Sequence, residues 1–201
     1  MRWIKKKIRQ VLALRAWLPR KVGGEVFTSL LTVFTWLVIV SFLRWPPTLA
    51  LIWLWLGGLV GMFLLEIDHL FYLLLIRPYE LTSLRLRRLL DQHRFKEALV
   101  LLVDTRQERI KLSFHHALFQ VVLLVLALFV LTSTISLFGA GLVMGMILHL
   151  LKDELGDLFV REEHLRRWLF WTVKTEVSFH FQKIFVMVMV LAFLGLNLLL
   201  I

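Results

Sequence analysis

The chain has 201 residues, of which 59% are hydrophobic and 19% are charged. A soluble domain is typically about 45–50% apolar and about 25% charged, so this composition excludes an ordinary soluble domain and a disordered chain. Lysine and arginine outnumber aspartate and glutamate by 24 to 14, which gives a net charge of +10. The absence of cysteine excludes disulfides, catalytic thiolates and cysteine-ligated metal sites.

The apolar residues lie in runs that are long enough to cross a bilayer, which takes about 20 helical residues. We therefore predict an all-α chain, a polytopic integral membrane protein with about five transmembrane helices. Residues 26–76 hold two of these helices, residues 114–152 hold two more, and residues 184–201 hold the last. The excess of lysine and arginine fits this class, because basic residues flank membrane spans and meet anionic lipid headgroups. Membrane lipids are therefore the expected partners, and nucleic acid is not.

Polar segments precede and separate the apolar runs. Residues 1–25 begin with a stretch of eight basic and no acidic side chains, in which apolar residues recur at helical intervals. This pattern predicts an N-terminal amphipathic helix on the membrane surface. Residues 77–113 predict a cytoplasmic helical hairpin, with a first helix that ends near Leu90 and a second over residues 94–104. Residues 153–183 form a further polar segment at the membrane interface.

The distribution of basic residues predicts which side of the membrane each segment faces. Every lysine and arginine except Arg44 falls in these three polar segments or at their edges. Because basic loops stay in the cytoplasm, we place the N-terminus and both long polar segments there, and the C-terminus outside. The expected location is a prokaryotic cytoplasmic membrane. Trp168 and Trp171 are expected to lie at the membrane interface, where tryptophan is enriched.

The most unusual feature of the apolar runs is a cluster of ionisable residues in the second one, Glu66, Asp68 and His69. An ionisable group inside a span costs about 2.5–3.5 kcal/mol on insertion scales. Either the span ends at Leu65 and these side chains lie among the headgroups, or they form a functional site. Residues 70–76 are again apolar, which favours the functional site.

Two further clusters contain histidine. His115 and His116 begin the third apolar run, and Gln120, on the face of His116, can hydrogen-bond a site residue or another helix. His149 and Asp153 end the fourth run, one helical turn apart and therefore on one face. Such a pair can ligate a metal or transfer a proton. In the predicted topology all three clusters lie at the cytoplasmic ends of their helices, so we predict one shared site near the inner leaflet.

Glycine spacing indicates that two of these helices pack face to face. Gly57 and Gly61 form a GxxxG pattern, which lets helices approach closely. Gly141 and Gly145 repeat at the same interval and lead to His149, one turn further on. The faces that pack together are therefore the faces that carry the ionisable residues.

Three short motifs occur in order along the chain: Glu66-Ile-Asp68-His69, Phe114-His115 and His149-Leu-Leu-Lys-Asp153. Together they resemble the motifs of the membrane-bound metal-dependent hydrolase family of the YdjM type. That family has Asp-x-Asp-His at the end of one span, a histidine motif opening the next, and His-x-x-x-Asp closing another. Glu66 here replaces the first aspartate, and Ile110 stands where the family tends to have a further histidine. The resemblance covers roughly residues 57–171 and implies a bound metal and hydrolysis of a phospholipid or another membrane-embedded ester.

These observations lead to the hypothesis of a membrane-embedded metal-dependent hydrolase that acts near the inner leaflet, on a lipid or lipid-linked ester. The candidate metal ligands are Asp68, His69, His115, His149 and Asp153. Glu66 is the candidate general base or a further ligand. Oxygen and imidazole ligands suit a divalent metal ion, and they do not distinguish zinc, manganese, iron and magnesium.

The alternative is a non-enzymatic multi-pass membrane protein. Its histidine–carboxylate cluster would be structural, and its hairpin would recruit a cytoplasmic partner. A proton or ion pathway is disfavoured, because the outer halves of the predicted spans carry few polar residues.

Overall fold

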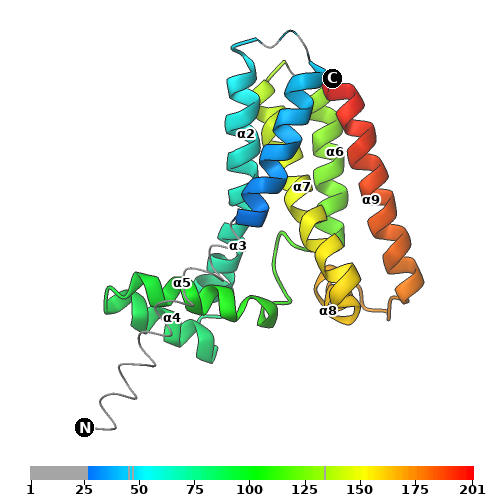
Figure 1. The fold of residues 1–201 in the computed structure, drawn as a ribbon. Helices are drawn as coiled ribbons and strands as arrows, with labels where there is room; N and C mark the ends of the chain where they lie inside the picture. The colour runs from blue at the N-terminus through cyan, green and yellow to red at the C-terminus, as the bar shows by residue number, and fades with distance from the viewer. Residues whose placement is uncertain (1–26, 45, 47, 134) are drawn as a thin grey trace.

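The computed structural model describes residues 27–44, 46, 48–133 and 135–201. Within these residues the chain is helical and contains no β-strand, as the predicted all-α class requires. The amphipathic helix predicted for residues 1–25 lies outside the described residues. Figure 1 shows the arrangement of the elements.

The first described helix covers Phe27–Leu43. The elements that follow in chain order are α2 (Leu51–Leu64), α3 (Glu66–Phe71), the π-helical turn η1 (Tyr72–Ile76), α4 (Leu81–Asp91), α5 (Phe95–Asp104), the 3₁₀ turn η2 (Arg106–Glu108), α6 (Ala117–Ser133), α7 (Leu137–Val160), α8 (Glu162–Leu169) and α9 (Phe179–Leu200). Between α2 and α3, Leu65 keeps helical backbone angles (φ −72°, ψ −27°). The two helices and η1 therefore form one run of 26 residues.

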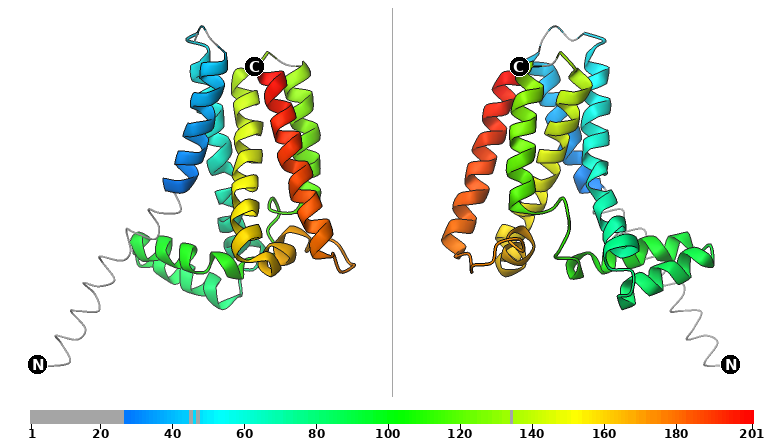
Figure 2. Two further views of the ribbon diagram at one scale, coloured as in Figure 1. Left: turned by 45° about the vertical axis from the view of Figure 1, so that its right-hand side comes forward. Right: turned by 180° about the vertical axis from the view of Figure 1, so that it is seen from behind.

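The long helices run alongside one another as a bundle, with α7 in contact with α2, α6 and α9 (Figures 1 and 2). The main core is built from their buried aliphatic side chains, among them Leu54, Met144 and Ile147. Helices α3 and α8 and the α4–α5 hairpin lie at one end of this bundle (Figure 1). At the opposite end Arg44 Nη1 donates a hydrogen bond of 2.9 Å to the carbonyl oxygen of Leu200.

The predicted glycine packing between α2 and α7 is confirmed. A Cβ atom at Gly57 or Gly61 would collide with the α7 backbone, at Phe138 and Leu142 respectively. In return, a Cβ at Gly141 or Gly145 would collide with the α2 backbone. The two helices thus touch backbone to backbone, and this close contact sets the positions of the polar residues that follow on each helix.

The helix lengths bear on the number of membrane spans. Two helical runs, Leu51–Ile76 and Phe179–Leu200, are long and apolar enough to cross a membrane by length and composition. Phe27–Leu43 and α6 are shorter apolar helices. Helix α7 has 24 residues, but its last third is charged. It also continues to Val160, beyond residue 152, where its membrane-spanning part was predicted to end, and Asp153, Glu154 and Asp157 find partners inside the protein.

The outward faces of α6 and α9 are covered with large apolar side chains. Val125 on α6 is 63% exposed and Leu191 on α9 is 61% exposed. Soluble monomers rarely expose contiguous apolar surface on this scale. The outer surface of the bundle is therefore unlike that of a soluble helical domain.

Candidate metal centre

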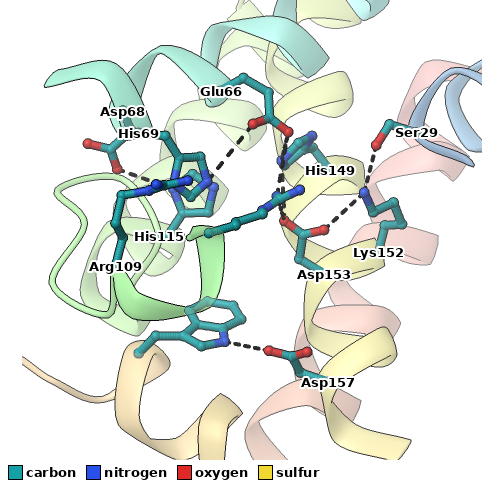
Figure 3. Close-up of polar contacts among 12 residues, drawn as sticks. Ser29, Glu66, Asp68, His69, Arg109, His115, His149, Lys152, Asp153 and Asp157 are labelled. Atoms are coloured by element: carbon teal, nitrogen blue, oxygen red, sulfur yellow. Dashed lines mark hydrogen bonds and ion pairs between the residues drawn. The ribbon is translucent and has the colours of Figure 1, made fainter. Parts of the chain in front are cut away.

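The predicted site residues lie together at the end of the bundle that carries the hairpin. Glu66, Asp68 and His69 come from α3, and His115 comes from the loop before α6 (Figure 3). His149 and Asp153 come from α7, whose backbone contact with α2 brings the two helices within reach of one another.

Three side chains form a group that can hold a metal ion. One ligand atom from each of His115, His149 and Asp153 lies within 4.8 Å of the other two. His149 Nε2 is 3.3 Å from Asp153 Oδ2. Both histidines are buried, and His115 Nε2 and both ring nitrogens of His149 have no hydrogen-bond partner.

Asp68 holds His115 in the orientation that a ligand needs. This fully buried carboxylate accepts the backbone N–H groups of Ser113 (3.2 Å) and Phe114 (2.7 Å). His115 Nδ1 lies 3.2 Å from Asp68 Oδ2. An ionised carboxylate only accepts, so we assign the His115 proton to Nδ1, which leaves a lone pair on Nε2. Metal-binding histidines commonly have such a carboxylate on the other ring nitrogen.

His69 has the opposite arrangement. Arg109 Nε donates to His69 Nδ1 at 3.1 Å, so in the neutral ring the proton lies on Nε2. That nitrogen is 3.9 Å from Glu66 Oε2. The Arg109 guanidinium is buried and also donates to Thr105 Oγ1 and to the Leu102 carbonyl. Burial and the nearby positive charge of Arg106 lower the pKa of Arg109 to about 10, so it remains a cation at neutral pH.

Two cations neutralise the acidic side of the site. Arg106 Nη2 in η2 is 2.7 Å from Asp153 Oδ2 and 3.5 Å from Glu66 Oε1. Lys152 Nζ is 3.0 Å from Asp153 Oδ1 and donates to Ser29 Oγ at 2.6 Å. Glu66 Oε1 also lies 3.7 Å from His149 Nε2 and faces the same space.

A second polar cluster lies one turn further along α7. Asp157 accepts hydrogen bonds from Trp168 Nε1 (2.9 Å) and Arg161 Nη2 (2.6 Å), and lies 2.7 Å from His164 Nδ1. His164 Nε2 is 3.0 Å from the carbonyl oxygen of Gln107 in η2. Both ring nitrogens thus face acceptors. The hydrogen bond to Asp157, the largest cause, raises the pKa of His164.

This cluster corrects the prediction that Trp168 is an interfacial aromatic. Only 6% of its surface is exposed, because its ring packs in a small core with Leu165 and Leu169 while its indole N–H is satisfied by Asp157. Trp171 is partly exposed, and its indole N–H donates to the carbonyl oxygen of Leu112.

The structure therefore gathers all the predicted site residues but gives them different surroundings. His115, His149 and Asp153 form the group that can hold an ion. Asp68 contacts His115, His69 contacts Arg109, and Glu66 lies beside His69 and His149. The remaining polar candidates lie outside this group. His116 accepts a hydrogen bond from the backbone N–H of Phe119. Gln120 donates a hydrogen bond to Glu154 on α7, so of its two predicted partners, a site residue or another helix, it contacts another helix.

Sequence reasoning did not single out three basic residues of the site, Arg106, Arg109 and Lys152. All three belong to polar stretches whose positive charge was assigned to membrane topology. Nothing in their spacing distinguishes a basic residue that enters the site from one that meets lipid headgroups.

In comparisons with known proteins, no protein-family model, no curated protein sequence and no solved structure matches the chain. What the site does is therefore argued from its own residues.

Proposed function

We propose that the protein is a membrane-embedded, metal-dependent hydrolase whose site lies near the cytoplasmic leaflet. The group His115, His149 and Asp153 carries this proposal, because His115 Nε2 and both ring nitrogens of His149 are buried without a hydrogen-bond partner. A buried polar atom without a hydrogen bond costs about 1–3 kcal/mol, so natural proteins rarely leave several side by side. A bound cation would satisfy one nitrogen of each histidine.

The donor set fits a divalent metal. His115 Nε2, His149 and Asp153 would hold it, and Asp68 would orient His115 rather than bind directly. Two nitrogen donors and one oxygen donor suit zinc, iron or manganese, and magnesium less well. When bound, such an ion polarises an ester oxygen and lowers the pKa of water.

The neighbouring residues supply the rest of a hydrolytic site. Glu66 has a partly exposed carboxylate between His69 and His149, which is a suitable position for a general base. His69 Nε2–H is a donor that can hydrogen-bond Glu66 or a substrate oxygen. Glu66, Asp68, His69, His115, His149 and Asp153 are also the residues on which the resemblance to YdjM-type hydrolases rests.

The proposed membrane arrangement has five spans: the Phe27–Leu43 helix, the Leu51–Ile76 run, α6, the apolar part of α7, and α9. The exposed apolar faces of α6 and α9 support it, because hydrocarbon is the surrounding in which such faces are stable. The Phe27–Leu43 helix and α6 each have 17 residues and are about 26 Å long at about 1.5 Å per residue, close to a hydrocarbon core of about 30 Å. The described basic segments, residues 77–113 and 153–183, lie at the hairpin end, which we place in the cytoplasm of a prokaryotic cell.

One observation favours a second candidate, the structural cluster. Arg106 already pairs with Asp153 and contacts Glu66, so these acids are neutralised by the protein itself. In that case the polar cluster would fasten η2 to α7 and present the hairpin to a cytoplasmic partner, without any metal.

Metal analysis of the detergent-purified full chain separates the two candidates. We expect one divalent ion per chain in the wild type and its loss in His149→Ala, whereas His180→Ala, at an exposed position at the start of α9, retains it. Equal metal content in the wild type and His149→Ala would contradict the hydrolase proposal. The structural candidate instead predicts that His149→Ala lowers the melting temperature and that a chelator changes nothing.

A further inference from the structure

Two cavities of different character meet at the site. The first, of about 440 Å³, is polar and is bounded by η2, the charged end of α7 and α8. The second, of about 250 Å³, is mostly apolar and lies between α2, α3 and α5. Four residues line both cavities, His69, Val103, Arg106 and Arg109, so the two cavities lie side by side next to the proposed metal ligands.

The polar cavity has a small excess of basic over acidic side chains. Its basic lining residues are Arg106, Arg109, Lys152 and Arg161, against the acids Asp104, Asp153 and Asp157. His164 adds a further positive charge when it is protonated. Arginine and lysine groups that surround a small space are suited to phosphate, which accepts several hydrogen bonds at once.

The apolar cavity lies near the protein surface. Phe63 on α2, Leu70 on α3 and Leu99 on α5 line it and are themselves exposed, Leu99 by 54%. Glu66 and His149 belong to the lining of the same cavity. A hydrocarbon chain in this cavity would therefore have Glu66, the proposed general base, beside it.

We infer that the two adjacent cavities together bind one amphiphile, an anionic lipid phosphate ester. Its phosphate lies in the polar cavity near Lys152 and Arg109, and one acyl chain lies in the apolar cavity beside Leu99. Binding depends only on residues of this chain, whereas cleavage rests on the proposed function. With the phosphate beside Asp153, the phosphoester is the bond in reach: water adds its oxygen to phosphorus, the bond from phosphorus to the alcohol oxygen breaks, and the alcohol leaves with a proton.

The binding test uses native mass spectrometry of the purified full chain in chelator, so that no turnover occurs. The probes are dioleoyl phosphatidic acid, dioleoylglycerol with the same chains but no phosphate, and glycerol 3-phosphate with no chains. We expect one phosphatidic acid per chain, bound at least about tenfold more tightly than either fragment, since each omits one of the two contacts. If dioleoylglycerol binds as tightly as phosphatidic acid, the polar cavity does not bind the phosphate. If glycerol 3-phosphate binds as tightly as phosphatidic acid, the apolar cavity does not bind an acyl chain.

Matched variants locate the lipid. Gly156 lines the polar cavity, and a Cβ atom there would meet no atom within 4 Å, so Gly156→Leu adds a side chain to the cavity lining from an uncrowded position. Gly195 on α9 has the same open surroundings and lines neither cavity, which makes Gly195→Leu its control. Leu99→Trp narrows the apolar cavity, and Leu84→Trp, at a similarly exposed leucine on α4, is its control.

We expect both cavity variants to weaken phosphatidic acid binding by about tenfold or more, and both controls to bind as the wild type does. Unchanged binding in Gly156→Leu or in Leu99→Trp would overturn the inference. Metal content measured on the same samples keeps the two proposals apart. Metal without selective lipid binding leaves the hydrolase proposal standing, and selective lipid binding without metal contradicts only the hydrolase.

Discussion

Three histidines of this protein differ in what they offer because their hydrogen-bond partners differ. His115 donates to a carboxylate and keeps a lone pair for a ligand. His69 accepts from a guanidinium and therefore presents an N–H group. His164 faces two acceptors and is suited to the protonated form. Their chemistry is set by residues far away in sequence, which is why each one needs its own test.

The role of Asp68 as the residue that orients His115 predicts the effect of Asp68→Asn. The variant keeps the size of the side chain but removes the charge that fixes the Nδ1 proton, so metal affinity should fall about 10–100-fold. Competition with a fluorescent chelator measures this affinity. Asp91→Asn, at an exposed position on α4, is the control and should bind as the wild type does. Unchanged affinity in Asp68→Asn would contradict the orienting role.

The raised pKa of His164 predicts a stability contribution that depends on pH. Because the folded-state pKa lies above the unfolded value of about 6.5, the contribution is complete below that pH and is lost as pH rises through the folded pKa. The melting temperature of the wild type should therefore exceed that of His164→Ala by more at pH 6 than at pH 8.5. The exposed His180 provides the control, with His180→Ala expected to show no such trend. A difference that grows with pH would contradict the prediction.

At the scale of elements, the contact between α2 and α7 decides whether the site exists, because it sets α3 beside the end of α7. Gly145→Ala would place a methyl group against the backbone of Gly58, which cannot move without separating the helices. Overpacking of this kind costs about 1–3 kcal/mol or more. Thermal unfolding in detergent should show the loss, together with reduced metal content.

The control for this prediction is Gly195→Ala, because the same change there meets open space. It should leave the stability unchanged or raise it by up to about 1 kcal/mol, since alanine favours a helix over glycine. Equal melting temperatures for Gly145→Ala and Gly195→Ala would show that the α2–α7 contact tolerates a methyl group and that the site does not depend on it.

Much of the arrangement of the helices could be predicted from residues that recur at helical intervals. The hairpin helices, expected to end near Leu90 and to cover residues 94–104, are α4 (Leu81–Asp91) and α5 (Phe95–Asp104). The glycine spacing correctly identified the α2–α7 contact. Helix α7 continues to Val160, into the segment 153–183 that was predicted as a polar cytoplasmic or interfacial segment, and its polar residues there have partners inside the protein. Hydropathy cannot detect such partners, since they come from η2, α6 and α8.

The site could be predicted as a set of residues but not as an arrangement. His115, His149 and Asp153 were recognisable because ionisable residues at the ends of apolar helices are costly in a membrane and therefore indicate a functional or structural role. The different hydrogen-bond partners of Asp68 and His69 could not be predicted, because they depend on which atoms face Ser113, Phe114 and Arg109. Backbone N–H groups and buried arginines leave no periodic signal in a sequence.

For the whole molecule, the bundle has two unlike ends. One carries the hairpin, α8 and the candidate site, and the other carries the α6–α7 connection and the C-terminus (Figure 1). The proposed entry of lipid requires that the hairpin end meets a membrane leaflet, which we propose is the cytoplasmic one. Orientation is therefore the property on which the proposed access of lipid depends.

Single cysteines test this orientation cleanly, because the chain has none of its own. Ile135 is 102% exposed in the α6–α7 connection, so the cysteine of Ile135→Cys should react with a membrane-impermeant maleimide in intact cells. Gln92 is exposed in the hairpin turn, so the cysteine of Gln92→Cys should react only after the membrane is permeabilised. The reverse pattern would place the hairpin outside the cell and contradict the charge rule. Reaction of both from outside would contradict a bundle that crosses the membrane, because its two ends would then share one compartment.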